Sequence, residues 1–192
     1  MTAGSAILSD LLDRGIPVVV VSFPAADARL GVIEVDEHAA MDGVVEHLLS
    51  LGHQRVFFMH SGAREEQVDV RPEAVRAALA ARGLEPAARL EDATAVCCTN
   101  DVVAIDLIDR LAQCGRRVPQ DVSVVGFDDI RMAGHARISL TTVRQPAVEM
   151  GRAAVEMLLT AISERRHVSQ RVVMPTELVV RGSTAAITAE AA

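Results

Sequence analysis

The sequence predicts an α/β fold built on parallel sheets. Residues 94–98 and 122–127 are short, almost wholly apolar runs of the kind that form strands covered on both faces. Between such runs the apolar residues recur at helical spacing, so strand and helix alternate. Ligands of parallel sheets bind beyond the carboxyl ends of the strands, which predicts a small-molecule site there. Polar side chains follow both runs at this position, namely Asn100, Asp101, Asp128 and Asp129.

Glycine and proline mark the ends of the predicted helices. Glycine adopts the left-handed conformation that ends a helix, and proline fits the first helical turn. Helices are therefore expected to close at Gly15, Gly52, Gly83 and Gly115, and to open at Pro72 and Pro146. The predicted strands lie at residues 17–21, 32–35, 55–59, 94–98, 122–127, 140–143 and 178–180.

Composition excludes several classes of protein. The 192 residues are 50% hydrophobic and 23% charged, enough to bury the core of one large domain or two small lobes. No apolar run reaches the length of about 18 residues that a membrane helix needs, and residues 1–15 lack the pattern of a secretory signal. We therefore expect a cytoplasmic protein. The net charge of −7, with scattered basic residues, disfavours a nucleic-acid surface on this chain.

The cysteines and histidines predict neither metal nor redox chemistry. Cys97 and Cys98 are adjacent inside an apolar strand, Cys114 stands apart, and no CxxC spacing or histidine cluster accompanies them. The sequence also has no nucleophile elbow and no phosphate-binding glycine loop. We expect buried, unreactive thiols at Cys97 and Cys98, no catalytic residues, no cofactor and no enzyme activity.

A series of short motifs, taken in order, resembles one protein family. The motifs stand at residues 15–19, 51–55, 94–96, 100–101, 115–119, 121–129, 140–143, 145–146, 149–151 and 181–184, the last preceded by Leu178. In this order they make the sequence similar to the effector-binding core of the LacI/GalR transcriptional repressors, itself related to the sugar-binding proteins of transport systems. The resemblance covers roughly residues 7 to 184.

The resemblance implies a two-lobed, periplasmic-binding-protein-like fold whose lobes close on a ligand. Three crossings between the lobes are implied, near Gly52, at residues 140–145 and after Ile162. The expected lobes are a partial N-terminal lobe, a C-terminal lobe and a short tail, at residues 1–52 with 144–164, 53–143 with 165–184, and 185–192 respectively.

The family's ligand contacts correspond here to Asp128, Asn100, Arg71 and Gln145, and the implied effector is a sugar or a nucleoside-like molecule. These residue types also make chemical sense. A polyhydroxyl ligand needs fixed donors and acceptors, and charged groups form the stronger hydrogen bonds.

Structural roles compete with binding at Asn100 and Arg71. Asn100 and Asp101 both suit a helix N-cap, and we expect Asp101 to be the cap and Asn100 the ligand contact. Arg71 could equally be a solvated arginine at a helix start, because Ala74 and Val75 replace the Gly-Phe pair of the family.

Asp128 and Gln145 have structural alternatives too. Asp128 could be a solvated loop carboxylate or could pair with Arg131. Gln145 could be no more than a polar neighbour of Pro146 at the start of a helix. Among the four candidates, Asp128 is the one we favour most.

Two parts of the family pattern have no counterpart here. Nothing that resembles a helix-turn-helix or the first strands of the N-terminal lobe precedes Ile7, and no strand and helix lie between Gly83 and Thr94. DNA binding would therefore need a helix-turn-helix outside this chain. We expect these gaps to expose apolar surface and the chain to be marginally stable or self-associated.

The function that follows is that of a sugar-sensing, homodimeric core of a LacI-type regulator. The alternative is a transport-associated sugar-binding protein. The alternative is disfavoured by the absence of a signal pattern, and residues 121–129 and 140–145 look more like the repressors.

Overall fold

The central strands of the chain form because their β-branched residues are buried on both faces. The computed structural model describes residues 3–22, 25, 27–60 and 69–187, and divides the chain into two units. Unit 1 consists of Met1–Asp36 with Pro146–Pro175, and unit 2 of Glu37–Gln145 with Thr176–Ala192. No helix within the described ranges combines the length and hydrophobicity needed to cross a membrane.

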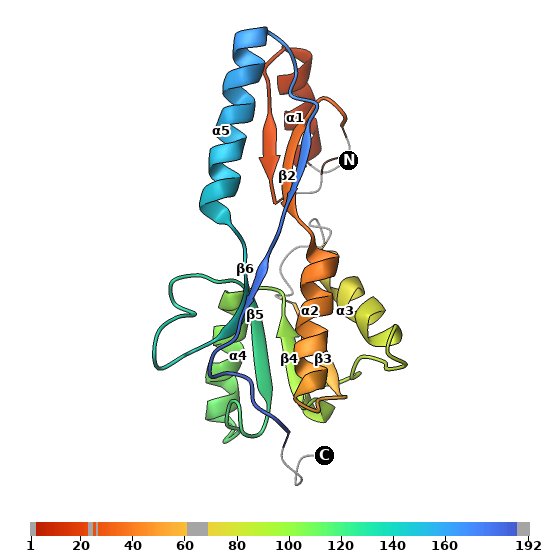
Figure 1. Cartoon of the computed structure of the whole chain (residues 1–192), viewed down its shortest axis with the longest axis vertical. Coiled ribbons are helices and arrows are strands. Elements are labelled where there is room, and N and C mark those ends of the chain that lie inside the picture. Colours follow the sequence, from red (N-terminus) through yellow and green to blue (C-terminus); the bar gives the residue numbers. More distant parts are fainter. Residues whose placement is uncertain (1–2, 23–24, 26, 61–68, 188–192) are drawn as a thin grey trace. The chain divides into compact units, whose positions relative to one another are not determined.

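Unit 1 is a three-stranded parallel sheet between two helices. The strand order is β1 (Val19–Val21), β2 (Gly31–Val35), β7 (Arg171–Met174). Helix α1 (Ala3–Asp13) lies on one face of the sheet and α5 (Ala147–Glu164) on the other (Figure 1). The α1 side is closed by a small cluster of Leu12, Leu30 and Val32.

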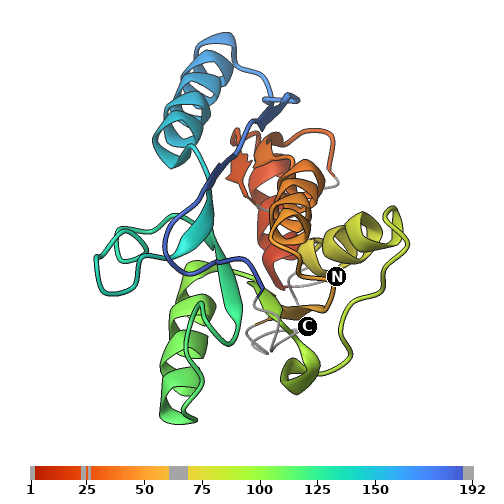
Figure 2. The ribbon, with the colours of Figure 1, turned by 60° about the horizontal axis from the view of Figure 1, so that its bottom comes forward.

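Unit 2 is a five-stranded sheet, and it carries the larger core. Its order is β3 (Val56–Met59), β4 (Ala95–Cys98), β5 (Ser123–Asp128), β6 (Thr141–Arg144), β8 (Glu177–Val179), parallel except for β8. Helices α2 (Glu37–Ser50) and α3 (Arg71–Ala80) lie on one side, and α4 (Asp101–Gln113) lies on the other (Figure 2). A short 3₁₀ turn, η1, spans Leu90–Asp92.

The adjacent cysteines behave as the sequence predicts. Cys97 and Cys98 are both buried in β4, whereas Cys114 is exposed after α4. Cys98 packs in the cluster on the α4 side of the sheet, and Cys97, its neighbour along the strand, points to the opposite face. Burial raises the pKa of the Cys97 thiol to about 12. Both buried thiols are therefore protonated and unreactive at neutral pH.

The division into units differs from the expected lobes at two places. The chain passes from unit 1 to unit 2 after Asp36, not near Gly52, because the apolar face of α2 packs against α3. Residues 165–175 lie in unit 1, not in the C-terminal lobe, because β7 pairs with β2. The sequence analysis missed β7 altogether, since the strand has only four residues and none of them is fully buried. The second passage, between Gln145 and Pro146, lies at the end of the crossing expected at residues 140–145 and two residues beyond the expected lobe boundary.

The segment between Gly83 and Thr94 covers unit 2 where we expected an uncovered core. The amide of Ala87 donates to the Val56 carbonyl at 2.8 Å, which ties the segment to the edge strand β3. Ala87, Leu90 and Ala93 pack against the core cluster. Val56 and Ala93 are both buried, so the expectation that the gap leaves apolar residues exposed is wrong for these two positions.

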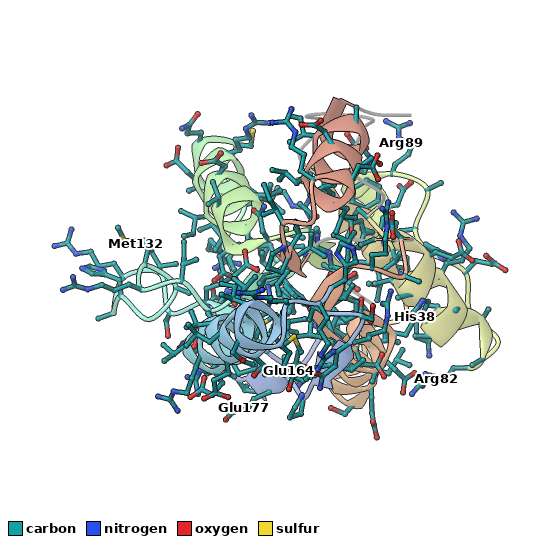
Figure 3. The ribbon with its side chains drawn as sticks, turned by 90° about the horizontal axis from the view of Figure 1, so that it is seen from above. His38, Arg82, Arg89, Met132, Glu164 and Glu177 are labelled. Atoms are coloured by element: carbon teal, nitrogen blue, oxygen red, sulfur yellow. The ribbon has the colours of Figure 1, made fainter. Side chains whose placement is uncertain are left out.

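Part of the expected C-terminal tail is packed against unit 2. The His53 ring donates from Nε2 to the Ala185 carbonyl at 2.9 Å, and the Ile187 amide donates to the Leu51 carbonyl at 2.9 Å. Residues 185–187 therefore form part of the folded unit, while residues 188–192 lie outside the described part of the chain. The loop between β5 and β6 projects from the unit, with Met132 at its outer part (Figure 3).

We expect unit 1 to open more readily than unit 2. On the side of β1 that faces away from β2, no strand pairs with it within the described ranges, and Val21 at its end is exposed. Strand β4, by contrast, is paired on both sides and buried throughout. Hydrogen exchange followed by mass spectrometry should show faster exchange in β1 and β2 than in β4 and β5. Equal protection of the two sheets would contradict this picture.

Candidate functional site

The candidate site lies in unit 2, at the carboxyl ends of β4 and β5. Asn100 comes two residues after β4, and Asp128 is the last residue of β5. Arg71 is the first residue of α3, and Gln145 follows β6. Because β4, β5 and β6 are parallel neighbours, their carboxyl ends share one edge of the sheet, and the four residues gather there.

Asp128 and Gln145 are joined directly. The Gln145 side chain donates from Nε2 to Asp128 Oδ1 at 2.7 Å, so neither proposed structural role, pairing with Arg131 or a position beside Pro146 alone, describes them. Burial raises the pKa of Asp128, an effect opposed by the Gln145 hydrogen bond and by the charge of Arg71. A half-buried carboxylate with one oxygen held by an amide is suited to accept hydrogen bonds from hydroxyl groups.

Backbone strain accompanies this arrangement. Asp128 has a φ of 111° and Asp129 a φ of 54°, backbone angles that residues other than glycine seldom adopt. Such strain persists only where the surroundings enforce it, and it gathers at functional sites.

Two arginines enforce the strained turn through Asp129. Asp129 Oδ1 accepts from Arg181 Nη2 at 2.6 Å, and Oδ2 accepts from Arg144 Nε at 2.7 Å. Arg144 also donates to Glu177 of β8, labelled in Figure 3. Burial disfavours the Asp129 carboxylate, but the two guanidinium groups outweigh it and lower its pKa. Asp129 thus stabilises the turn that presents Asp128.

Arg71 is fixed in place by three groups. Its Nε donates to Asp69 Oδ1 at 2.7 Å, its Nη1 donates to the Thr99 carbonyl at 2.7 Å, and its guanidinium carbon lies 4.9 Å from the centre of the Phe127 ring. The side chain is only 19% exposed. Arg71 is therefore not a solvated helix-start arginine, and its cation–π contact places it above the strand that ends in Asp128.

Asp69 completes this part of the site, and the sequence analysis did not identify it. Its second carboxylate oxygen accepts from the Thr99 hydroxyl at 2.5 Å, so one aspartate positions both Arg71 and the end of β4. Burial opposes ionisation of Asp69, yet the hydrogen bonds from Arg71 and Thr99 prevail and lower its pKa. An acidic residue two positions before an arginine was the available signal, though a weak one.

Asn100, not Asp101, is the N-cap of α4. Asn100 Oδ1 accepts from the Val103 amide at 2.9 Å, and the backbone of Asn100 is extended, as a cap requires. The expectation that Asp101 caps the helix is wrong. The cap occupies the amide oxygen of Asn100, so a ligand contact would use the amide nitrogen as a donor.

Asp101 is instead a fully buried side chain that forms hydrogen bonds beneath the site. Its Oδ1 accepts from the Thr142 hydroxyl at 2.5 Å, and its Oδ2 accepts from the Ile130 amide at 2.8 Å. Burial raises its pKa. Gly126 makes room for it, since a Cβ at that position would collide with Asp101 Oδ1. Asp101 therefore connects the start of α4 to β6 across β5, which ends in Asp128.

The site as a whole is polar and carries both signs of charge. The described residues include no group of three or more histidine, cysteine, aspartate or glutamate side chains placed to hold a metal ion. Asp128 with Gln145 and Asp69 with Arg71 instead offer acceptors and donors around the rim of a sheet, beside the buried ring of Phe127. Such an arrangement suits hydrogen bonding to a small polar molecule.

Comparison with known proteins identifies the family. The model of the periplasmic binding protein-like domain matches residues 45–184. The HTH-type transcriptional regulator MalR of Streptomyces coelicolor is 35% identical over 92% of this chain, and the match covers 58% of that regulator. The chain thus spans a little under three fifths of this relative.

Solved structures agree with the sequence comparison. A LacI transcriptional regulator from a Rhodococcus species superposes with a TM-score of 0.82 at 30% identity, over 94% of this chain and 74% of the other. A LacI family regulator from Enterococcus faecium, with bound ribose, gives a TM-score of 0.83 at 27% identity, over 96% and 76%. The chain therefore belongs to the periplasmic binding protein-like family, as an effector-binding core of the LacI type of transcriptional regulator.

Proposed function

We propose that this chain senses an uncharged sugar through the site around Asp128, on behalf of a LacI-type regulator. The observation that carries the proposal is the half-buried Asp128 carboxylate held by Gln145 at 2.7 Å, on the edge where ligands of parallel sheets bind. A sugar hydroxyl would donate to Asp128, and the amide of Asn100 would donate to a sugar oxygen.

The charges around the site favour a neutral sugar over a phosphorylated one. Asp128 and Asp69 contribute two carboxylates, and Arg71 is already engaged by Asp69 and the Thr99 carbonyl. A phosphate would therefore meet more negative charge than positive. The ribose found in the Enterococcus faecium relative is an uncharged sugar and supports the proposal.

The rest of the proposal concerns partners. We propose that the core works as a cytoplasmic homodimer and reaches DNA only through a helix-turn-helix outside this chain. The regulator names of the relatives support this, and the transport role is not favoured. We further propose that the chain is not an enzyme.

A sugar panel tests the proposal. Thermal unfolding of the chain should be recorded with pentoses, hexoses, disaccharides and sugar phosphates, and calorimetry should follow for each hit. We expect at least one neutral sugar to stabilise the chain, by about 2.7 kcal/mol at a concentration of about 100 times its Kd.

Matched variants make the panel specific. Asp128→Ala should lose the stabilisation, and Asp106→Ala, which removes an exposed aspartate of α4, should keep it. Stabilisation by sugar phosphates alone, or equal stabilisation of both variants, would contradict the proposed site.

A further inference from the structure

Two histidine side chains of unit 2 contact the C-terminal segment, residues 184–187. His53 Nε2 donates to the Ala185 carbonyl at 2.9 Å. His47 Nε2 and the Thr184 hydroxyl are 3.0 Å apart and form a second hydrogen bond. In Figure 1 the dark blue end of the described trace lies beside the lower end of α2. Because His47 belongs to α2 and His53 follows its end, the two rings attach the segment to one end of this helix.

His53 is a buried ring with one nitrogen that has no partner. The side chain is only 3% exposed, and Nε2 lies 2.9 Å from Ser123 Oγ as well as from the Ala185 carbonyl. Since Nε2 carries the hydrogen, Nδ1 of the neutral ring has none. Nδ1 is buried and finds no hydrogen-bond partner within the described ranges. A second proton on this ring would therefore place a charged N–H group where nothing accepts it.

The groups around His53 do not compensate a positive charge. Ser123 of β5 and residues 184–187 are uncharged, and the titratable group of α2 that acts on His53 is His47. Burial lowers the pKa of His53, the hydrogen bond to Ala185 opposes this, and the charge of His47 adds to the lowering. Burial lowers the pKa of His47 too. The closed arrangement therefore favours two neutral rings.

We propose that His47 and His53 form a pH-sensitive clasp, which holds residues 184–187 on unit 2 while both rings are neutral and releases them on acidification. Release exposes the rings to water, where a positive charge is solvated. The clasp lies at the start of β5, beside Ser123, whereas Asp128 is the last residue of that strand. It is therefore separate from the candidate sugar site.

The released part begins after Ser183, because the contacts of Ser183 involve no titratable group. Its hydroxyl donates to the Val124 carbonyl at 2.6 Å and accepts from the Thr141 amide at 2.8 Å. Its carbonyl accepts from the Val124 amide at 2.9 Å. These bonds join Ser183 to β5 and β6 at any pH, so we expect only residues 184–187 to detach.

The direction of the pH dependence follows from the lowered pKa of His53. Above the ordinary histidine value of about 6.5 the ring is neutral in both states, and the clasp has its full stability. Below this value the released state binds a proton that the closed state excludes. The clasp therefore weakens as the pH falls from about 6.5 through the lowered pKa, by up to about tenfold for each pH unit and each ring.

Amide hydrogen exchange measured by NMR on the full chain tests the clasp. The amides of Ala185 and Ile187 are the reporters, since they donate to Ser123 Oγ at 3.1 Å and to the Leu51 carbonyl at 2.9 Å. After correction for intrinsic exchange rates, their protection should fall about tenfold between roughly pH 7.5 and pH 5.5. The Arg181 amide, which donates to a threonine hydroxyl at 2.9 Å, should keep its protection.

Glutamine variants separate titration from packing. Glutamine places an amide donor near the position of Nε2 and does not titrate. The double variant H47Q/H53Q should therefore hold the segment at neutral pH and lose the pH response. His38→Gln is the matched control, because it removes an exposed histidine of the same helix, labelled in Figure 3, and should keep the response of the unchanged chain.

A titration of the ring signals of the unchanged chain tests the clasp without any variant. His53 should titrate at a lower pH than an ordinary histidine. Three results would overturn the proposal. The first is protection of the Ala185 and Ile187 amides that does not change with pH. The second is an equal loss of protection in β4, which would mean global unfolding, and the third is a pH response that survives in the folded double variant.

Discussion

Replacing Asp128 by alanine is expected to weaken effector binding by about 1.5–3 kcal/mol, roughly 10- to 150-fold. The variant removes the acceptor of a charge-assisted hydrogen bond and releases the Gln145 amide that Asp128 now holds at 2.7 Å. Calorimetry with the sugar selected by the thermal panel measures the change. An unchanged affinity would remove Asp128 from the site.

The pH dependence of sugar binding should reflect the protonation of Asp128. Burial raises the pKa of Asp128, so its protonation begins at a higher pH than for an ordinary aspartate. The affinity should therefore fall as the pH falls through this raised pKa. An affinity that declines only at the pH of an ordinary aspartate, or equally in Asp128→Asn, would point to another group.

Asp128→Asn separates binding from stability. A carboxyl with a raised pKa in the folded state adds stability below its unfolded pKa, and this stability is lost as the pH rises through the folded pKa. Removing the charge should therefore increase the free energy of unfolding at neutral pH, while it weakens the binding of the sugar. Denaturant unfolding of the free chain measures the first effect, and calorimetry measures the second.

Replacing Asp101 by alanine is expected to cost about 2–4 kcal/mol of the stability of unit 2. The change leaves the buried Thr142 hydroxyl and the Ile130 amide without an acceptor, at about 1–3 kcal/mol for each group. Loss of the buried charge, whose cost the raised pKa of Asp101 reflects, offsets part of this. Denaturant unfolding followed by far-UV circular dichroism measures the loss.

A double-mutant cycle tests whether the hydrogen bond between Asp101 and Thr142 contributes to stability as described. Thr142→Val removes only the hydroxyl that donates to Asp101. In the double variant D101A/T142V that hydroxyl is absent, so Asp101→Ala no longer leaves it without an acceptor. The double variant should therefore be more stable than the sum of the single losses predicts. Strict additivity would show that the two side chains do not depend on each other.

The sequence predicted most elements of the fold because each of these elements has a clear local pattern of apolar residues or of residues that end a helix. The strands at residues 94–98 and 122–127 were found because both are buried on each face, and the helices because glycine or proline marks their ends. Strand β7 was missed, since its partly buried residues alternate with exposed ones over only four positions. The unit to which α2 belongs is decided by its packing against α3, which no periodicity reveals.

The candidate site was predicted only in part. The four residues named from the sequence do gather at one sheet edge, yet the groups that hold them, Asp69, Asp129 with its arginines, and Asp101, are distant in sequence from their partners. The sequence analysis placed Gly126 in an apolar strand. Its lack of a side chain leaves space for Asp101, and this role is visible only in the three-dimensional structure. The resulting error was to assign the N-cap of α4 to Asp101 instead of Asn100.

An NMR titration of the chain with the sugar selected by the thermal panel tests the central claim most directly. Binding at the proposed site predicts that the largest amide shifts gather at Asn100, Asp128 and Gln145, with the start of α3 around Arg71 included. The same titration of Asp128→Ala should require roughly 10- to 150-fold more sugar. Saturable shifts centred on other residues, with these four unmoved, would show that the effector binds elsewhere.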